Sequence, residues 1–364
     1  MKKKRNILIC PLEWGLGHSG RSLVIVKKLV AAGNNIIIGA GEEHLAFFRK
    51  EAPELTYISF PGYRPAYSRF LPQYLKLLIN LPVLTLHTIR EHNQLKKIIK
   101  EYNIDIVISD NRFGLWNRDI RTLYITHMPR IPFPSFFRFL EFTGVLLHRM
   151  IIRRYSLCFI PDLPGEPNVS GRLSHGIKLP ANVRYIGLLS RFQETEGASS
   201  DSQETARHNT VVLSGPEPQR EILRKQLADI LKDREPVTVF LGGKPAGCEK
   251  MIREGNIIWH DHLNASAMRD TILTSDSIIT RAGYTSVMEL ISLGCRALLI
   301  PTPGQTEQEY LARSLSEKGW FASVSQKNIR PEGILVSKGA SWPEDLITQS
   351  KVYLEKAIEE LLKD

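Results

Sequence analysis

Short β-rich runs alternate with helical patterns along almost the whole chain, and this alternation limits the possible folds more than any other feature. In the first half the runs lie at 6–10, 35–40, 55–60, 105–110, 122–126 and 157–161. A second series follows, with strands expected at 210–215, 237–243, 256–260, 277–283 and 296–304 and helices at 218–233, 265–275, 285–294 and 306–319. Strands that alternate with helices form parallel sheets covered by helices. The sequence therefore predicts an α/β protein with two Rossmann-like, doubly wound domains that face each other across a cleft.

The length of 364 residues supports the same division, because it suits two domains of about 150 to 200 residues each. Residues 190–209 are polar and lack apolar periodicity, which is typical of a linker or a mobile loop. We therefore expect an N-terminal domain at 1–189 and a C-terminal domain at 210–341. Residues 342–364 read as an amphipathic helix that must pack somewhere, and the N-terminal domain is one surface that could receive it.

The composition is that of a soluble globular protein, with 43% apolar and 24% charged residues. No apolar stretch approaches the roughly 20 residues that a membrane span needs. The basic start, MKKKR, is followed by an apolar run that ends at Pro11 and Glu13, which is too short for a signal-peptide core. We expect a cytoplasmic protein.

Charge is distributed unequally between the two halves. Residues 1–190 carry 27 Lys and Arg against 13 Asp and Glu, whereas residues 191–364 carry 21 against 25. Within the first half, residues 121–154 hold six Arg and only Glu141 as an acid, interleaved with Phe, Leu and Ile. Arg beside exposed aromatic residues suits an anionic membrane surface, and the alternative is a buried helix with solvated Arg tips. No nucleic-acid-binding module is recognisable, so nucleic acid is not an expected partner.

The first loop raises the question of a dinucleotide. Residues 15–20 read GLGHSG, a G-x-G-x-x-G that follows the first strand and precedes a helical pattern beginning near Arg21. In the dinucleotide fingerprint the first Gly ends the strand, whereas here the four residues 11–14 intervene and include Glu13 and Trp14. Glu42 nevertheless stands after the second strand, where an acidic residue would bind a ribose. Spacing alone therefore leaves the dinucleotide reading open.

The densest polar loops of the second domain also follow strands. One strand is expected to end at Thr280, and a helix should open near Thr285 or Ser286, where free N–H groups can hold a phosphate. Glu289 stands one helical turn further, where it could accept the hydroxyls of a ribose or only complement the helix dipole. Arg281 could lie near a phosphate or brace the loop.

The span 277–312 resembles the donor-binding segment of the GT-B glycosyltransferases of family 28. That family contains the UDP-N-acetylglucosamine transferase of the peptidoglycan lipid intermediate, and the wider chain is closer to uncharacterised bacterial relatives of that enzyme. Its pattern is matched in order and spacing by Arg281, Gly283, Ser286, Glu289 and Gln308. The loop GLGHSGRS resembles the family's N-terminal Gly-rich loop, and LSGPEPQR occupies the place of the loop that opens the donor domain.

The resemblance implies an inverting transferase of the hexosyltransferase class, with a UDP-sugar donor in the second domain and an acceptor in the first. The acceptor is expected to be lipid-linked, a glycan or at a membrane surface, with the protein peripheral on the inner face of the cytoplasmic membrane. UDP-sugar would be a substrate, and no cofactor is expected. The implied substrate-binding residues are Gly15, Gly17, Ser214, Gly215, Arg281, Gly283, Tyr284, Thr285, Ser286, Glu289, Gln305, Glu307 and Gln308.

Two departures from the family pattern affect the choice of sugar. Glu309 follows Gln308 where the peptidoglycan enzyme has paired Gln, and Tyr284 stands where a small residue is usual. N-acetylglucosamine is therefore not implied as the donor sugar.

Inverting transfer needs a base that takes the proton of the acceptor hydroxyl, and His18 in the first loop is the leading candidate. The alternative is that His18 only hydrogen-bonds a phosphate or its own loop. Asp110 and His127, both at expected strand ends, and Glu13 are the other candidates for the base.

A metal site is not expected. The run WHDHL at 259–263 places Asp261 between His260 and His262, but three adjacent side chains do not easily converge on one ion. No D-x-D motif follows a strand elsewhere, and the four Cys lie far apart with no C-x-x-C pair.

Two other classes of function remain open on the same fold. An epimerase or hydrolase of UDP-sugars would convert the donor with no acceptor present. A noncatalytic sugar-nucleotide or lipid binder would convert nothing.

Overall fold

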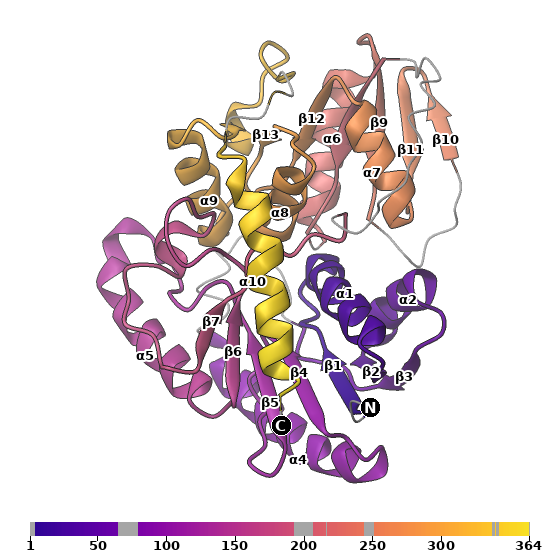
Figure 1. The fold of residues 1–364 in the computed structure, drawn as a ribbon. Helices are drawn as coiled ribbons and strands as arrows, with labels where there is room; N and C mark the ends of the chain where they lie inside the picture. Colours follow the sequence, from indigo (N-terminus) through magenta and orange to yellow (C-terminus); the bar gives the residue numbers. More distant parts are fainter. Residues whose placement is uncertain are drawn as a thin grey trace.

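The computed structural model describes residues 4–64, 79–192, 207–215, 217–243, 251–336, 339 and 342–363. Two seven-stranded sheets organise these residues (Figure 1). The first sheet has the order β3-β2-β1-β4-β5-β6-β7, and its neighbouring strands are all parallel. Its strands are β1 (Asn6–Cys10), β2 (Asn35–Ala40), β3 (Thr56–Ser59), β4 (Ile106–Asp110), β5 (Arg121–Ile125), β6 (Leu157–Ile160) and β7 (Val183–Tyr185).

The second sheet has the order β10-β11-β9-β8-β12-β13-β14. Its strands are β8 (His208–Val212), β9 (Val237–Leu241), β10 (Met251–Glu254), β11 (Ile257–His260), β12 (Ser277–Thr280), β13 (Leu298–Leu299) and β14 (Ala322–Ser323). Only the edge strand β10 runs antiparallel to its neighbour. The prediction of two doubly wound α/β domains is thus confirmed.

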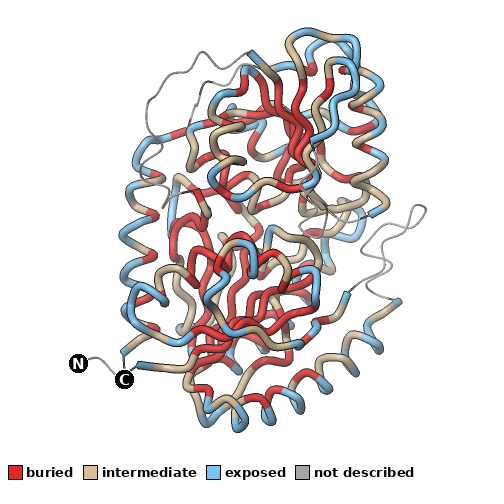
Figure 2. Tube along the Cα trace, turned by 90° about the vertical axis from the view of Figure 1, so that its right-hand side faces the viewer, coloured by how far each residue is buried: buried red, intermediate tan, exposed pale blue. Residues whose placement is uncertain are grey.

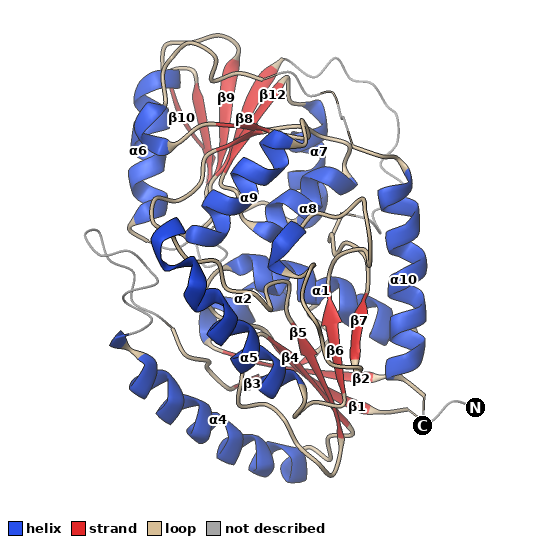
Figure 3. Ribbon diagram, turned by 90° about the vertical axis from the view of Figure 1, so that its left-hand side faces the viewer, coloured by secondary structure: helices blue, strands red, loops and turns tan. Residues whose placement is uncertain are grey.

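Helices cover both faces of each sheet (Figure 3), so the central strands are buried on both sides and read as continuous apolar runs. Buried residues lie along both sheets (Figure 2): one cluster continues from the first sheet into the second, and further clusters lie on each sheet. The α-helices are α1 (Leu16–Ala31), α2 (Glu42–Glu51), α4 (Leu81–Glu101), α5 (Glu141–Ile152), α6 (Gln219–Leu231), α7 (Ala265–Thr274), α8 (Tyr284–Ser292), α9 (Thr306–Glu317) and α10 (Asp345–Leu361). Short 3-10 helices are η1 (Ser135–Leu140), η2 (Gly171–Leu173) and η3 (Gln326–Asn328). No helix among the described residues is long and apolar enough to cross a membrane.

Helix α1 begins inside the glycine-rich loop, five residues before the start that the sequence suggested at Arg21. Gly15 precedes the helix with φ 154° and ψ 155°, a conformation that is essentially restricted to glycine. Gly17 lies in the first turn, where a Cβ atom would stand 3.0 Å from the Thr285 hydroxyl oxygen. The glycines therefore let α1 begin early and pack closely on α8, at some cost in helix propensity.

The order of strands reverses direction between β1 and β4 in the first sheet and between β8 and β12 in the second. Ligands of open α/β sheets bind outside the carboxyl ends of the strands at such a switch point. The loop before α1 and Asp110 lie at the first switch point, and Ser214 and Arg281 follow the two strands at the second. The predicted site residues thus gather at both switch points.

Helix α10 returns from the second sheet to the first and runs along both (Figure 1). The carboxylate of Glu360 pairs with both ends of the Arg184 guanidinium, at 2.9 Å in each case. At Gly187, which has φ +74°, a Cβ atom would stand 2.3 Å from the Cα atom of Ser350. Of the expected linker 190–209, residues 193–206 lie outside the described part of the chain.

Candidate active site

His18, Asp110 and a third residue, Arg21, form a buried cluster at the first switch point. His18 and Arg21 project from the first turns of α1, three residues apart and so on one helix face. Arg21 donates from Nε to Asp110 Oδ2 at 2.8 Å and pairs through Nη2 with Oδ1 of the same carboxylate. His18 Nδ1 lies 3.1 Å from Asp110 Oδ2 and 2.9 Å from Arg21 Nη2. The cluster joins a candidate base to a carboxylate and a cation.

Electrostatics in this cluster favour an ionised carboxylate and a neutral imidazole. Burial lowers the pKa of His18, the charge of Arg21 lowers it further, and Asp110 opposes the shift. Burial alone would raise the pKa of Asp110, but the charges of Arg21 and His18 hold it well below its usual range. At neutral pH His18 can therefore accept a proton.

His127 connects the cluster to the second domain. Its Nδ1 lies 3.0 Å from Arg21 Nη1, and its Nε2 lies 2.7 Å from Glu307 Oε1 in the first turn of α9. Its ring stacks on Tyr284 of α8 with centroids 4.3 Å apart. The hydrogen bond from His127 keeps the pKa of the Glu307 carboxyl below its usual value, although burial acts in the opposite direction. Both ring nitrogens of His127 are thus engaged, which argues against its use as a base.

Three helix starts come together around these residues. The caps of α1, α8 and α9 make no side-chain hydrogen bond to their helices. Thr285, in the first turn of α8, donates its hydroxyl to the backbone oxygen of Gly17 in α1 at 3.2 Å. Ser286 follows at the third position of α8. Because unpaired N–H groups and the positive ends of helix dipoles attract anions, this place suits a phosphate.

Glu289 lies inside the contact between the two domains. Its Oε1 is 2.8 Å from Nε of Arg191, which belongs to the segment that leaves the first sheet. The same oxygen would stand 3.6 Å from a Cβ atom on Gly20 of α1. Burial raises the pKa of Glu289, and the nearby charge of Arg191 opposes this shift. The candidate ribose-binding carboxylate is therefore ion-paired in this structure.

Arg281 braces the loops of the second domain. Its guanidinium is fully buried and donates to the backbone oxygens of Gln219, Ile300 and Pro301 and to Gln326 Oε1. Burial lowers the pKa of Arg281 to about 10. The sequence left two roles open for Arg281, contact with a phosphate or support of the loop. The observed contacts are those of loop support.

The residues at the start of α9 also support their own loop. Gln308 accepts a hydrogen bond from the backbone N–H of Thr302 at 2.9 Å, and Glu309 accepts one from Gly304 at the same distance. Gln305 is the cap of α9. Tyr284 is buried and donates its hydroxyl to the backbone oxygen of Pro161 in the first domain at 2.7 Å. The two departures from the family pattern, Tyr284 and Glu309, thus have contacts of their own.

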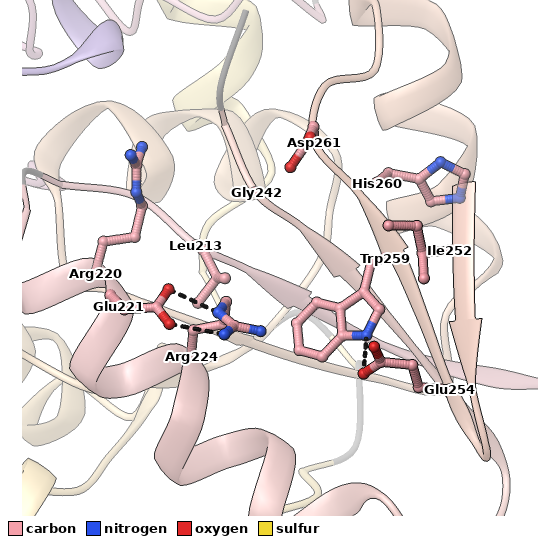
Figure 4. A pocket seen from close by; sticks show the side chains of 10 residues that line it. All are labelled: Leu213, Arg220, Glu221, Arg224, Gly242, Ile252, Glu254, Trp259, His260 and Asp261. Carbon is pink, nitrogen blue, oxygen red and sulfur yellow. Dashed lines mark hydrogen bonds and ion pairs between the residues drawn. The ribbon is translucent and has the colours of Figure 1, made fainter. Parts of the chain in front are cut away.

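A pocket of about 380 Å³ lies in the part of the second sheet formed by β8, β9, β11 and β10 (Figure 4). Leu213, Gly242, His260 and Asp261, from the ends of β8, β9 and β11, form one rim, and Arg220 and Arg224 come from α6. The remaining lining residues are Glu221, Ile252, Glu254 and Trp259. Ser214 and Gly215, two predicted site residues, continue the chain from the Leu213 rim.

Glu13, the remaining candidate base, holds the first loop in place. Its carboxylate accepts hydrogen bonds from the backbone N–H groups of Gly41 and Gly62 and from Arg64 Nε. These contacts lower its pKa even though burial acts to raise it. Among the described residues no three His, Cys, Asp or Glu side chains are placed to hold one metal ion, and the WHDHL run is no exception.

Two residues that complete the site, Arg21 and Arg191, did not stand out from the sequence. A helix predicted to begin at Leu16 would have indicated Arg21, because residues three apart share a helix face and Arg21 then lies beside His18. Arg191 lies in an irregular segment, and only the tertiary structure brings it to Glu289.

Comparison with known proteins identifies the second domain. Residues 221–352 match the glycosyltransferase family 28 C-terminal domain. A Methanosarcina acetivorans protein named as an uncharacterized glycosyltransferase is 26% identical over 352 residues, which cover 88% of this chain and 86% of the relative. Over 70 residues, 19% of either chain, the protein is 36% identical to the UDP-N-acetylglucosamine–N-acetylmuramyl-(pentapeptide) pyrophosphoryl-undecaprenol N-acetylglucosamine transferase of Desulforudis audaxviator.

The fold is shared with solved glycosyltransferases. The crystal structure of the kitacinnamycin glycotransferase superposes with a TM-score of 0.60 at 14% identity, covering 100% of this chain and 94% of the other. This likeness shows the fold, and the match of residues 221–352 shows the family of the second domain. The chain is a glycosyltransferase of the GT-B fold that carries the family 28 C-terminal domain.

Proposed function

We propose that the protein transfers a hexosyl group from a UDP-sugar to an acceptor hydroxyl with inversion at the anomeric carbon. The observation that carries this proposal is the placement of His18, which contacts Asp110, in the first turn of α1, where the neighbouring Gly17 is bonded to Thr285 at the uncapped start of α8. A base in one domain then faces an anion-binding helix start in the other. The sugar would lie between them.

The transfer would use these groups in the following way. His18 Nε2 takes the proton of the acceptor hydroxyl while its Nδ1–H is donated to Asp110, and the acceptor oxygen attacks the anomeric carbon. The bond from that carbon to the diphosphate oxygen breaks, and UDP leaves with the electron pair. The N–H groups at the starts of α8 and α1 stabilise the charge that develops on the diphosphate.

Ser286 and Glu289 are the residues that we assign to UDP itself. Ser286 stands where it can donate a hydrogen bond to a phosphate oxygen. Glu289 can accept hydrogen bonds from the two ribose hydroxyls once its ion pair with Arg191 has broken. We assign recognition of the sugar to the start of α9, which holds Gln305, Glu307 and Gln308. This helix start meets the buried cluster through the contact between Glu307 and His127.

The choice of nucleotide can be tested by calorimetry with UDP and NAD. UDP should bind much more tightly than NAD, because the first loop is wide and contains Trp14 where dinucleotide binders keep a tight turn. A preference for NAD would restore the dinucleotide reading of the first loop and remove the UDP assignment.

The acceptor is proposed to lie at an anionic bilayer. Helix α5 buries Val145, His148 and Ile152, but η1 and α5 together expose Phe136 (82%), Phe139 (72%) and Phe142 (65%). Helix α4 lies on the same side of the molecule as α5 (Figure 3) and exposes Leu86 and Ile89. Arg138 of η1 and Arg153 and Arg154, which follow α5, are also exposed. This apolar and cationic surface, which we call the α5 face, supports peripheral docking on the inner leaflet of the cytoplasmic membrane.

Charge reversal tests this docking. Arg138→Glu with Arg153→Glu should weaken binding to phosphatidylglycerol vesicles by about 1 kcal/mol per residue changed, and added salt should weaken binding of the unmodified protein. Arg130 is a poor choice, because its guanidinium donates to the backbone oxygens of Arg172 and Gly176.

The matched control reverses Lys351 and Lys356, two exposed lysines of α10, a helix that lies apart from α4 and α5 (Figure 3). It changes the total charge equally and should bind almost as well as the unmodified protein. Equal binding of the unmodified protein to neutral and anionic vesicles in a sedimentation assay would rule out the docking proposal.

A further inference from the structure

Arg21 is the most heavily engaged side chain of the candidate site, and neither the proposed proton transfer nor the donor assignment uses it. It is 1% exposed and is among the largest fully buried side chains of the protein. Its three guanidinium nitrogens contact three different residues, which are Asp110, His18 and His127. Taking a charge out of water costs free energy unless its partners are well placed. The burial of Arg21 therefore suggests a role for its charge in the site.

The contacts of Arg21 determine which ring nitrogens of His127 carry hydrogen. A guanidinium can only donate, so His127 Nδ1, at 3.0 Å from Nη1, must accept and is unprotonated. The carboxylate of Glu307 can only accept, so His127 Nε2, at 2.7 Å, carries the hydrogen. His127 is therefore held as the neutral Nε2–H tautomer between the two domains.

At His18 both partners contact the same ring nitrogen, Nδ1. Arg21 Nη2 at 2.9 Å requires an unprotonated Nδ1, whereas Asp110 Oδ2 at 3.1 Å requires a protonated one. One nitrogen cannot satisfy both partners at once. The contact with Arg21 must break whenever Nδ1 carries hydrogen, both in charged His18 and in the neutral tautomer that donates to Asp110. The positive charge of Arg21 beside the ring still favours neutral over charged His18, whereas Asp110 stabilises the charged form and, within the neutral form, the Nδ1–H tautomer.

We propose that Arg21 is a positioning residue whose buried positive charge beside the ring keeps His18 neutral, while Asp110 selects the Nδ1–H tautomer that leaves Nε2 free to accept a proton. This inference deepens the proposed function and rests on His18 being the base of the transferase. Arg21 does not touch the substrate in this account. It acts through His18, and its contact with Asp110 keeps that carboxylate from pairing with His18 alone.

The other charged and titratable groups near His18 are consistent with a net effect of this sign. Burial and Arg21 lower the pKa of His18, and Asp110 raises it without cancelling them. The groups that face His18 from the packed elements are Arg21 of α1, Asp110 of β4, His127 after β5, Glu307 of α9 and His44 of α2. Removing Arg21 removes the only cation of fixed charge in this set.

Variants of two buried arginines test the proposal by NMR titration of the ten histidines in ¹⁵N-histidine-labelled protein. His18→Gln and His127→Gln assign the two signals. Arg21→Gln should raise the pKa of His18 by about 1 unit or more. Because a base must be unprotonated to act, the acidic limb of the pH–turnover profile should move to higher pH by the same amount. Arg21→Lys, which keeps the charge but not the forked contact, should raise it less.

Arg112→Gln is the matched control. Arg112 is 2% exposed in the same domain, pairs with the buried Glu91 and donates to the backbone oxygens of Gly39 and Phe60, without any contact to His18. Its loss should destabilise the fold in a similar way and leave the pKa of His18 where it was. Equal shifts in the two variants, or no shift in Arg21→Gln, would overturn the proposal.

The unmodified protein provides a test that does not depend on the stability of any variant. Its His18 should be neutral at pH 7, and the ring of its His127 should carry the hydrogen on Nε2 and none on Nδ1. A protonated Nδ1 on His127, or a charged His18 at pH 7, would contradict the proposal. These titrations use no substrate, whereas calorimetry with UDP tests the proposed function, so the two can fail separately.

Discussion

Alanine at position 18 is expected to lower turnover by about 10² to 10⁴ while leaving the affinity for UDP nearly unchanged. The reason is that His18 belongs to the first domain and the donor is assigned to the second. Turnover should fall in the unmodified enzyme as the pH drops through the pKa of His18. Since that pKa lies below the usual value of 6.5, the acidic limb should lie below pH 6.5 and should vanish in the variant.

Asparagine and glutamine at position 18 distinguish the base from a phosphate contact. Neither can take up a proton at neutral pH, so neither should restore turnover if His18 is the base. If His18 instead holds the donor diphosphate, UDP binding should fall in His18→Ala, and Asn or Gln should restore part of it as a hydrogen-bond donor. An active His18→Ala enzyme that keeps its acidic limb would transfer the role to Asp110, because both nitrogens of His127 are engaged.

Glu289→Ala is expected to weaken UDP binding by about 1.5 to 3 kcal/mol, which is about 10- to 150-fold in the dissociation constant. The expected loss is that of two hydrogen bonds from ribose hydroxyls to a carboxylate. Calorimetric titration with UDP measures it directly. Glu289→Gln keeps an acceptor oxygen at the same place and should lose less than the alanine variant.

Arg191→Met separates this role from a purely structural one. Glu289 is ion-paired with Arg191 at the contact between the domains, so alanine at position 289 also leaves a buried guanidinium without its carboxylate. If Glu289 only serves to hold Arg191, the two variants should lose the same UDP affinity. The ribose assignment predicts a clearly smaller loss in Arg191→Met, because the carboxylate stays in place. Unchanged affinity in Glu289→Ala would remove the donor-site assignment.

The central strands could be predicted from the sequence because parallel strands buried on both faces are continuous apolar runs. The elements that escaped prediction lack that pattern for physical reasons. β10 (Met251–Glu254) is exposed along its whole length at the edge of its sheet, and β14 (Ala322–Ser323) has only two residues. The start of α1 was missed because Gly17 and Gly20 are poor helix formers, and their packing against α8 is a tertiary effect.

The candidate site could be located from the sequence but not assembled from it. His18, Asp110 and His127 each follow a strand of one parallel sheet, so their convergence follows from the topology. The topology does not predict which side chains contact His18, Asp110 and His127, and these contacts determine their protonation states. Arg21 reaches His127 across 106 positions and Glu307 reaches it across 180. The pairing of Glu289 with Arg191 likewise depends on how the two domains meet.

The most direct test of the central claim is a transfer assay in which the purified protein is incubated with a panel of UDP-sugars, with and without extracted membrane lipids. Mass spectrometry then follows both UDP and glycolipid products. The account predicts UDP release that depends on the lipid extract and that is matched by a product heavier than its acceptor by one sugar, with only slow donor hydrolysis in the absence of lipid. Conversion of a UDP-sugar at the same rate without any acceptor would contradict it and indicate an epimerase or hydrolase, and the absence of any conversion across the panel would indicate a binding protein.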